Sequence, residues 1–103
     1  MELIELELKE LDKVLAEKRR IEFMFNTMGI KITQRKLLTE LLKKFWLSAF
    51  MMQQALQSSS ADRIMRFIRE EPPEGYSVRQ IDKKIEGYED CLQYKLVKNG
   101  SLF

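Results

Sequence analysis

The chain has 103 residues, of which 45% are hydrophobic and 33% are charged, and its formal net charge is +2. This balance excludes an intrinsically disordered chain, and the small net charge excludes a protein that coats nucleic acid nonspecifically. Only four glycines and two prolines are present, so turns are few and long helices are favoured over a β-sandwich or barrel.

Residue types that catalysis requires are missing from the sequence. There is no histidine, which excludes Ser-His-Asp and Cys-His nucleophilic systems and most zinc sites. The single cysteine, Cys91, follows Glu89 and Asp90, whose charges disfavour a reactive thiolate, so we expect a core or interface residue. No glycine-rich loop of the phosphate-binding or dinucleotide-binding type occurs. The sequence therefore predicts a binding protein that is not an enzyme and holds no metal or cofactor.

The sequence also indicates a compartment. Charges interrupt the first residues, so no secretory hydrophobic segment is present, and the apolar stretch 45–52 is too short to cross a membrane. One cysteine cannot form an intramolecular disulfide. We therefore expect a cytoplasmic protein in a reducing, intracellular setting, without a membrane partner.

Residues 2–27 predict a first helix, because apolar residues recur at steps of three and four. Those at positions 4, 8, 11 and 15 form a short heptad-like seam, which Lys18 and Glu22 interrupt. Such a seam suits a helical hairpin or a short coiled-coil contact. Gly29 can adopt the left-handed conformation that ends a helix.

Thr33 is suited to cap a second helix, predicted over 34–57. Between residues 45 and 52 this helix is apolar on nearly every side, so either another copy of the chain or the rest of its own fold must cover it. We expect that residues 1–57 form a helical hairpin that makes a homodimer. The predicted interface residues lie on both helices: Leu11, Leu15, Leu42, Trp46, Phe50 and Met51.

A polar linker at 57–60 precedes a third helix, predicted over 61–71 and ended by Pro72 and Pro73. Three arginines at three-residue steps form a basic stripe on this helix: Arg63, Arg66 and Arg69. A stripe of this kind is usually a solvated face. Two further helices are predicted over 78–86 and 88–98, so residues 60–103 make a three-helix unit.

Residues 62–103 resemble the helix-turn-helix core of winged-helix proteins. The matching residues are Ile64, Phe67, Ile68, Pro73, Gly75, Ser77, Val78, Ile81, Ile85, Leu96, Val97, Lys98, Asn99 and Gly100. The resemblance implies that the helix at 88–98 reads DNA. Because that helix is followed directly by the end of the chain, we expect no wing hairpin.

The sequence as a whole predicts an all-α protein with an N-terminal helical hairpin and a helix-turn-helix-like unit. The first functional hypothesis is a small dimeric regulator that binds double-stranded DNA. Tyr94, Lys95 and Lys98 would face the DNA, while Arg79, Lys83 and Lys84 would hold phosphates.

The second hypothesis is a protein-binding adaptor or inhibitor that acts through helical surfaces without nucleic-acid contact. The near-neutral charge, the carboxylates of Glu86, Glu89 and Asp90, and the apolar stretch 45–52 favour it.

Overall fold

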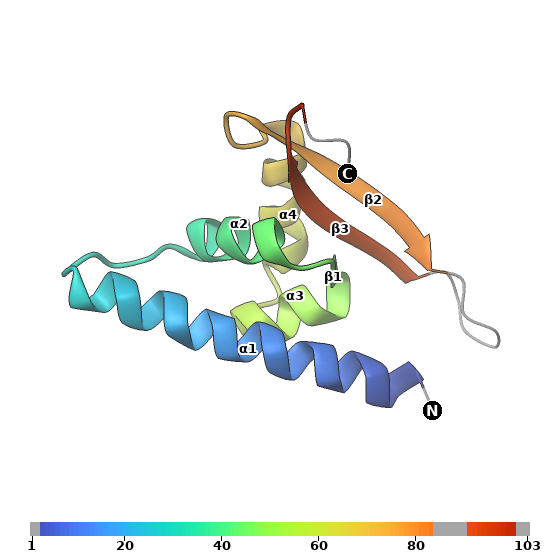
Figure 1. The fold of residues 1–103 in the computed structure, drawn as a ribbon, viewed down its shortest axis with the longest axis horizontal. Helices are drawn as coiled ribbons and strands as arrows, with labels where there is room; N and C mark the ends of the chain where they lie inside the picture. Colours follow the sequence, from blue (N-terminus) through green and yellow to red (C-terminus); the bar gives the residue numbers. More distant parts are fainter. Residues whose placement is uncertain (1–2, 84–90, 101–103) are drawn as a thin grey trace.

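The computed structural model describes residues 3–83 and 91–100 (Figure 1). In chain order the elements are α1 (Leu3–Thr27), α2 (Gln34–Lys44), β1 (Leu47–Ser48), α3 (Ala49–Leu56), α4 (Ala61–Glu70), β2 (Tyr76–Lys83) and β3 (Cys91–Lys98). The strands form one antiparallel sheet in the order β1-β3-β2. The prediction of an all-α protein is therefore wrong, and the fold is mixed α and β.

The two C-terminal helices predicted over 78–86 and 88–98 are strands instead. Strand β2 pairs with β3 in a continuous register from Tyr76 opposite Lys98 to Lys83 opposite Cys91. The apolar residues of these segments are too few for local spacing to distinguish a helix from a strand. Pairing between strands makes these segments extended, because it provides hydrogen-bond partners for their backbone N–H and C=O groups. It also places the side chain of Leu96 in the core, where it is 2% exposed.

The single helix predicted over 34–57 is also wrong. Helix α2 ends at Lys44, where Phe45 is extended (φ −129°, ψ 149°), and the chain then adds β1 to the sheet. Ser48 starts α3 by accepting a hydrogen bond on Oγ from the backbone N–H of Met51 at 3.3 Å. The apolar stretch 45–52 is thus divided between two elements with different directions, and most of it is covered within the chain.

Strands β2 and β3 form an antiparallel hairpin that follows α4 in the chain. This hairpin was not predicted from the sequence, because the same residues were assigned to two helices. Strand β1 pairs with β3, as Leu47 lies opposite Tyr94 and Ser48 opposite Gln93. Residues on both sides of the linker at 57–60 therefore share one sheet and one core.

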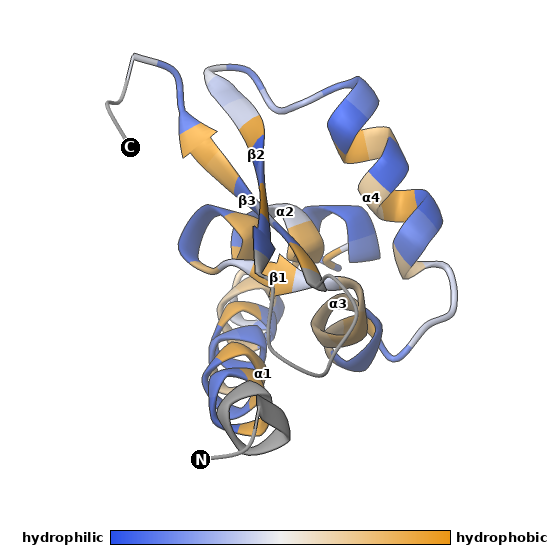
Figure 2. Ribbon diagram, turned by 90° about the vertical axis from the view of Figure 1, so that its right-hand side faces the viewer, coloured by the Kyte–Doolittle hydropathy of each residue, from blue (hydrophilic) through white to orange (hydrophobic). Residues whose placement is uncertain are grey.

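Helix α2 lies at the centre of the core. Its buried side carries Leu37, Leu38, Leu41 and Leu42, as the leucine spacing predicts, and it contacts α1, α3, α4 and β3. Figure 2 shows apolar and polar residues alternating along α1 and α4. No helix in the described part of the chain is both long and apolar enough to cross a bilayer.

An ion-pair cluster joins α1 to α2 at the edge of this core. The Oε1 atom of Glu17 accepts from Nζ of Lys44 at 2.6 Å and from Nε of Arg20 at 3.0 Å. The hydrogen bond from Arg20, followed by that from Lys44, lowers the pKa of Glu17 to about 2. The contact joins two consecutive helices through residues that are 27 positions apart.

We expect Leu38→Ala to lower the free energy of unfolding by about 2–5 kcal/mol, because its fully buried side chain leaves a cavity in the centre of the fold. Urea denaturation followed by circular dichroism measures this. Ile30→Ala, at a side chain that is 53% exposed, is the control and should cost less than about 0.5 kcal/mol. Equal losses from the two variants would contradict the central position of α2.

The Glu17 cluster predicts a pH dependence of stability. Because the folded pKa lies below the usual 4.5, the stabilisation is complete above pH 4.5 and is lost as the pH falls toward 2. Glu17→Gln should lower stability at pH 7 by up to about 1 kcal/mol, the range of exposed ion pairs, and flatten the decline between pH 4.5 and 2. Denaturation at several pH values tests this, and an unchanged decline in the variant would contradict it.

Candidate nucleic-acid interface

Helix α4 turns one side to the core and leaves the other in solvent. Ala61, Met65 and Ile68 are buried, whereas the side chains of Arg63, Arg66 and Arg69 are exposed. The helix follows the polar linker and stops at Glu71, whose N–H still donates to the carbonyl of Phe67, before the two prolines. This local sequence presents the arginines along a regular helical surface.

The arginines of α4 form no ion pair with a carboxylate of the described residues. Among residues 8–82 and 92–100, whose side chains the structure describes, the ion pairs lie on α1 and α2, and none involves Arg63, Arg66 or Arg69. The exposed part of α4 also carries the carboxylates of Asp62 and Glu70, so the three arginines leave the helix with a net charge of +1.

One of these arginines joins α4 to the hairpin. The Arg69 guanidinium lies 5.3 Å from the centroid of the Tyr94 ring, and Nη1 is 3.5 Å from the phenol oxygen. A guanidinium over an aromatic face at this distance is attracted to the ring. The contact links the end of α4 to the middle of β3.

The hairpin has a second group of cations. Arg79 and Lys95 are register partners on adjacent strands, so two like charges lie directly opposite each other. Lys95 also borders a hollow of about 370 Å³, together with Lys43, Trp46, Tyr76, Leu96, Val97 and Lys98. Since no carboxylate of the described residues lines this hollow, it is an electropositive recess.

The structure separates the predicted DNA-binding residues. Arg79 lies opposite Lys95, whereas Tyr94, the neighbour of Lys95 along β3, contacts α4. Lys98 is exposed at the far end of the hairpin, opposite Tyr76. Lys83 is the last residue of β2 and its side chain is outside the description, while Lys84, Glu86, Glu89 and Asp90 lie outside the described residues altogether. All of the described members belong to strands rather than to a reading helix.

The residues predicted to form a dimer interface differ in how far they are buried within the single chain. Leu11, Leu42 and Met51 are buried in the chain's own core, with exposures of 7%, 0% and 2%. Leu15 and Trp46 are partly exposed, and Phe50 is 45% exposed. The surface that the sequence proposed for self-association is therefore largely used within one chain.

The α4 arginines were visible in the sequence as a stripe, but the stripe alone indicated only a solvated face. The fold adds two facts, namely that α4 directly follows α3 and that the hairpin lies beside it (Figure 1). No group of three or more potential metal ligands occurs within residues 3–83 and 91–100.

The chain matches no protein-family model, no curated protein and no solved structure. A DNA-binding or regulatory role therefore has no support from similarity, and depends on the geometry of the interface alone.

Because Arg79 and Lys95 lie opposite each other in the hairpin, we expect their repulsion to lower the free energy of unfolding. Lys95→Glu should raise the free energy of unfolding by about 0.2–1 kcal/mol, because an attraction to Arg79 replaces a repulsion. Thermal denaturation at low salt measures this. Lys95→Gln, which removes the repulsion without adding an attraction, should lie between the wild type and Lys95→Glu. A Lys95→Glu variant less stable than Lys95→Gln would contradict the electrostatic interpretation.

Proposed function

We propose that this protein binds double-stranded DNA, with α4 in the major groove and the β2–β3 hairpin against the flanking backbone. The observation that carries the proposal is the exposed row of Arg63, Arg66 and Arg69 on α4, which has no carboxylate partner in the described structure. The major groove admits one α-helix, and arginine is the residue that most often contacts guanine there.

The position of α4 in the fold supports this assignment. Helices α3 and α4 are joined by residues 57–60, and Gln57 turns the chain through a left-handed conformation (φ 51°, ψ 41°). In a helix-turn-helix the second helix reads the groove while the first lies across it. Helix α4 is second in this pair and carries the arginines. The DNA-reading element is thus proposed to be the helix at 61–70, not the segment at 88–98.

The hairpin would supply contacts that position the protein without reading sequence. Arg79 and Lys95 are placed as a pair of cations, and a phosphate lying between two like charges relieves their repulsion. The contact between Arg69 and Tyr94 holds α4 and β3 together, so both elements would meet the duplex as one surface. Binding to DNA would place the protein inside the cell.

A second candidate is a protein-binding adaptor. Phe67 lies on α4 among the arginines and is 47% exposed. Phenylalanine and arginine are both enriched at the centres of protein interfaces. In that case Phe67, rather than the charges, would dominate the binding energy, and salt would have little effect on affinity.

The DNA proposal predicts a salt-dependent affinity that depends on α4. Fluorescence anisotropy with a mixed-sequence duplex of about two helical turns should show binding that weakens steeply as salt rises. The double variant Arg63→Ala/Arg66→Ala should bind more weakly, and the slope of log K against log[salt] should fall by about one for each phosphate that the variant no longer neutralises. Phe67→Ala should have a smaller effect than the arginine variant.

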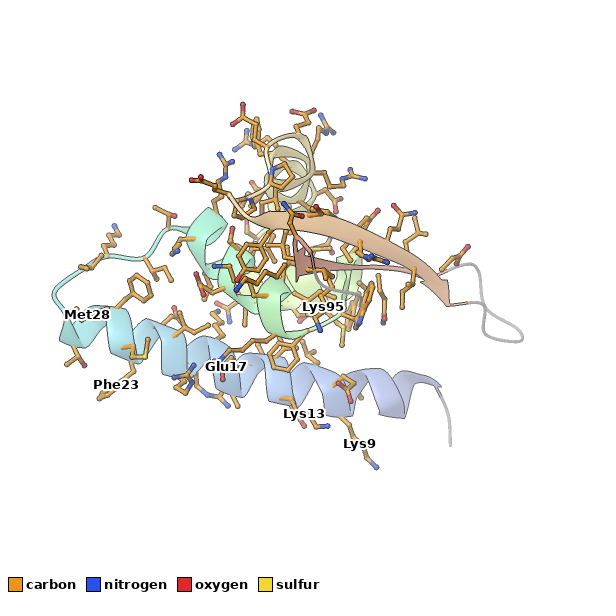
Figure 3. All side chains as sticks on the ribbon, turned by 45° about the horizontal axis from the view of Figure 1, so that its top comes forward. Lys9, Lys13, Glu17, Phe23, Met28 and Lys95 are labelled. Carbon is orange, nitrogen blue, oxygen red and sulfur yellow. The ribbon has the colours of Figure 1, made fainter. Side chains whose placement is uncertain are left out.

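Lys9→Ala is the matched control, because it removes an exposed positive charge from α1, where the side chain points away from the rest of the protein (Figure 3). It should leave the affinity nearly unchanged. Two results would overturn the proposal: absence of binding even at low salt, or an equal loss of affinity in Lys9→Ala and in the arginine variant.

A further inference from the structure

Helix α1 has an apolar stripe on its solvent side. Its inner side is formed by Leu11, Val14 and Ile21, all of which are buried. Leu8 and Phe23 lie outside this inner side and are 48% and 72% exposed. In Figure 3, Phe23 points away from the sheet. A helix that leaves side chains of this size in water has apolar surface available for a partner.

The stripe follows the helical repeat. Steps of three and four residues from Leu8 pass through Asp12, Leu15, Arg19 and Phe23, so these five residues lie along one side of α1. Asp12 and Arg19 are exposed, whereas Leu15 is half-buried and packs against the edge of the core. We call these five residues the outer stripe. It has apolar residues at its ends and centre, with one acidic and one basic residue between them.

The charges of α1 are segregated along its length. Residues 1–12 contain five acidic residues and one basic residue, whereas residues 13–27 contain four basic and two acidic residues. A parallel copy of the helix would place like charges together. An antiparallel copy places the acidic half of each helix beside the basic half of the other. The charge distribution therefore favours a second copy of α1 in the antiparallel orientation.

We propose that two copies of this chain associate through antiparallel packing of their α1 helices, with the two-fold axis between Leu15 and Ala16. In this register Leu8 lies level with Phe23 of the second copy, and Asp12 lies level with Arg19 of the second copy. The two-fold axis repeats each of these contacts. The axis lies close to the middle of Leu3–Thr27, so the helices overlap along about 36 Å at a rise of about 1.5 Å per residue.

The surface beside the stripe is recessed. Arg19, Glu22, Phe23 and Asn26 border a hollow together with residues 30–32, and Leu15 borders another beside α3 and the linker. Each hollow includes a residue of the outer stripe, so both adjoin the proposed contact. The inference depends on α1 alone and is independent of the DNA-binding proposal, which concerns α4 and the hairpin.

Charge reversal tests the register. Sedimentation equilibrium should show a wild-type dimer, and Asp12→Arg or Arg19→Asp alone should weaken it by about tenfold or more in Kd, because each variant brings two like charges together. The double variant Asp12→Arg/Arg19→Asp should restore the Kd to within about threefold of the wild type, because the pair is re-formed with its signs exchanged.

These side chains lie outside the core, so the variants should keep the helical circular dichroism of the wild type and the comparison should not be confused by unfolding. A wild type that stays monomeric at high concentration would overturn the proposal. So would single reversals that leave the dimer unchanged, or a double variant that is no tighter than the single ones.

Cross-linking tests the orientation. In a Cys91→Ser background, Ala16→Cys should form a disulfide-linked dimer under mild oxidation, because the two introduced thiols would lie on either side of the two-fold axis. Lys13→Cys is the control: its side chain is exposed but does not belong to the outer stripe, and in this register it lies level with Lys18 of the second copy rather than with itself, so it should cross-link much less. Equal cross-linking of the two variants would contradict the antiparallel arrangement.

Discussion

The leucine side of α2 is the surface on which the rest of the structure is assembled. Leu38, Leu41 and Leu42 are completely buried there, and the helix contacts α1, α3, α4 and β3. Burial of this apolar area is the main favourable term in folding. Helix α2 also holds α4 with its arginines outward and contacts the strand β3 of the hairpin.

Charges are distributed unequally over this framework. The ion pairs of the described residues join or line α1 and α2, and Glu17 links the two helices through Lys44. Among residues 8–82 and 92–100, the arginines of α4 and Arg79, Lys95 and Lys98 of the hairpin have no ion-pair partner, and Arg79 and Lys95 lie opposite each other at a cost in stability. Positive charge that is left uncompensated in this way favours binding to an anion over stability of the isolated fold.

The two proposed surfaces belong to different elements. Dimer contacts are assigned to the outer stripe of α1, and DNA contacts to α4 and the hairpin, so self-association leaves the DNA surface open. A two-fold dimer carries two copies of α4 related by the same axis, which is the symmetry of a palindromic DNA site. Self-association through α1 is thus compatible with DNA binding, while each is tested separately.

The sequence by itself determined the elements whose signal is local. The spacing of apolar residues predicted helices over 2–27 and 61–71, close to α1 and α4, and it identified the leucines of α2, because the contacts that define a helix join residues three and four apart. The arginine stripe was also visible at this level. Only the tertiary structure decided the hairpin and the break after Lys44. Strands β2 and β3 exist because they pair with each other and with β1, and a strand's partner cannot be found from the strand's own residues when its apolar pattern is short.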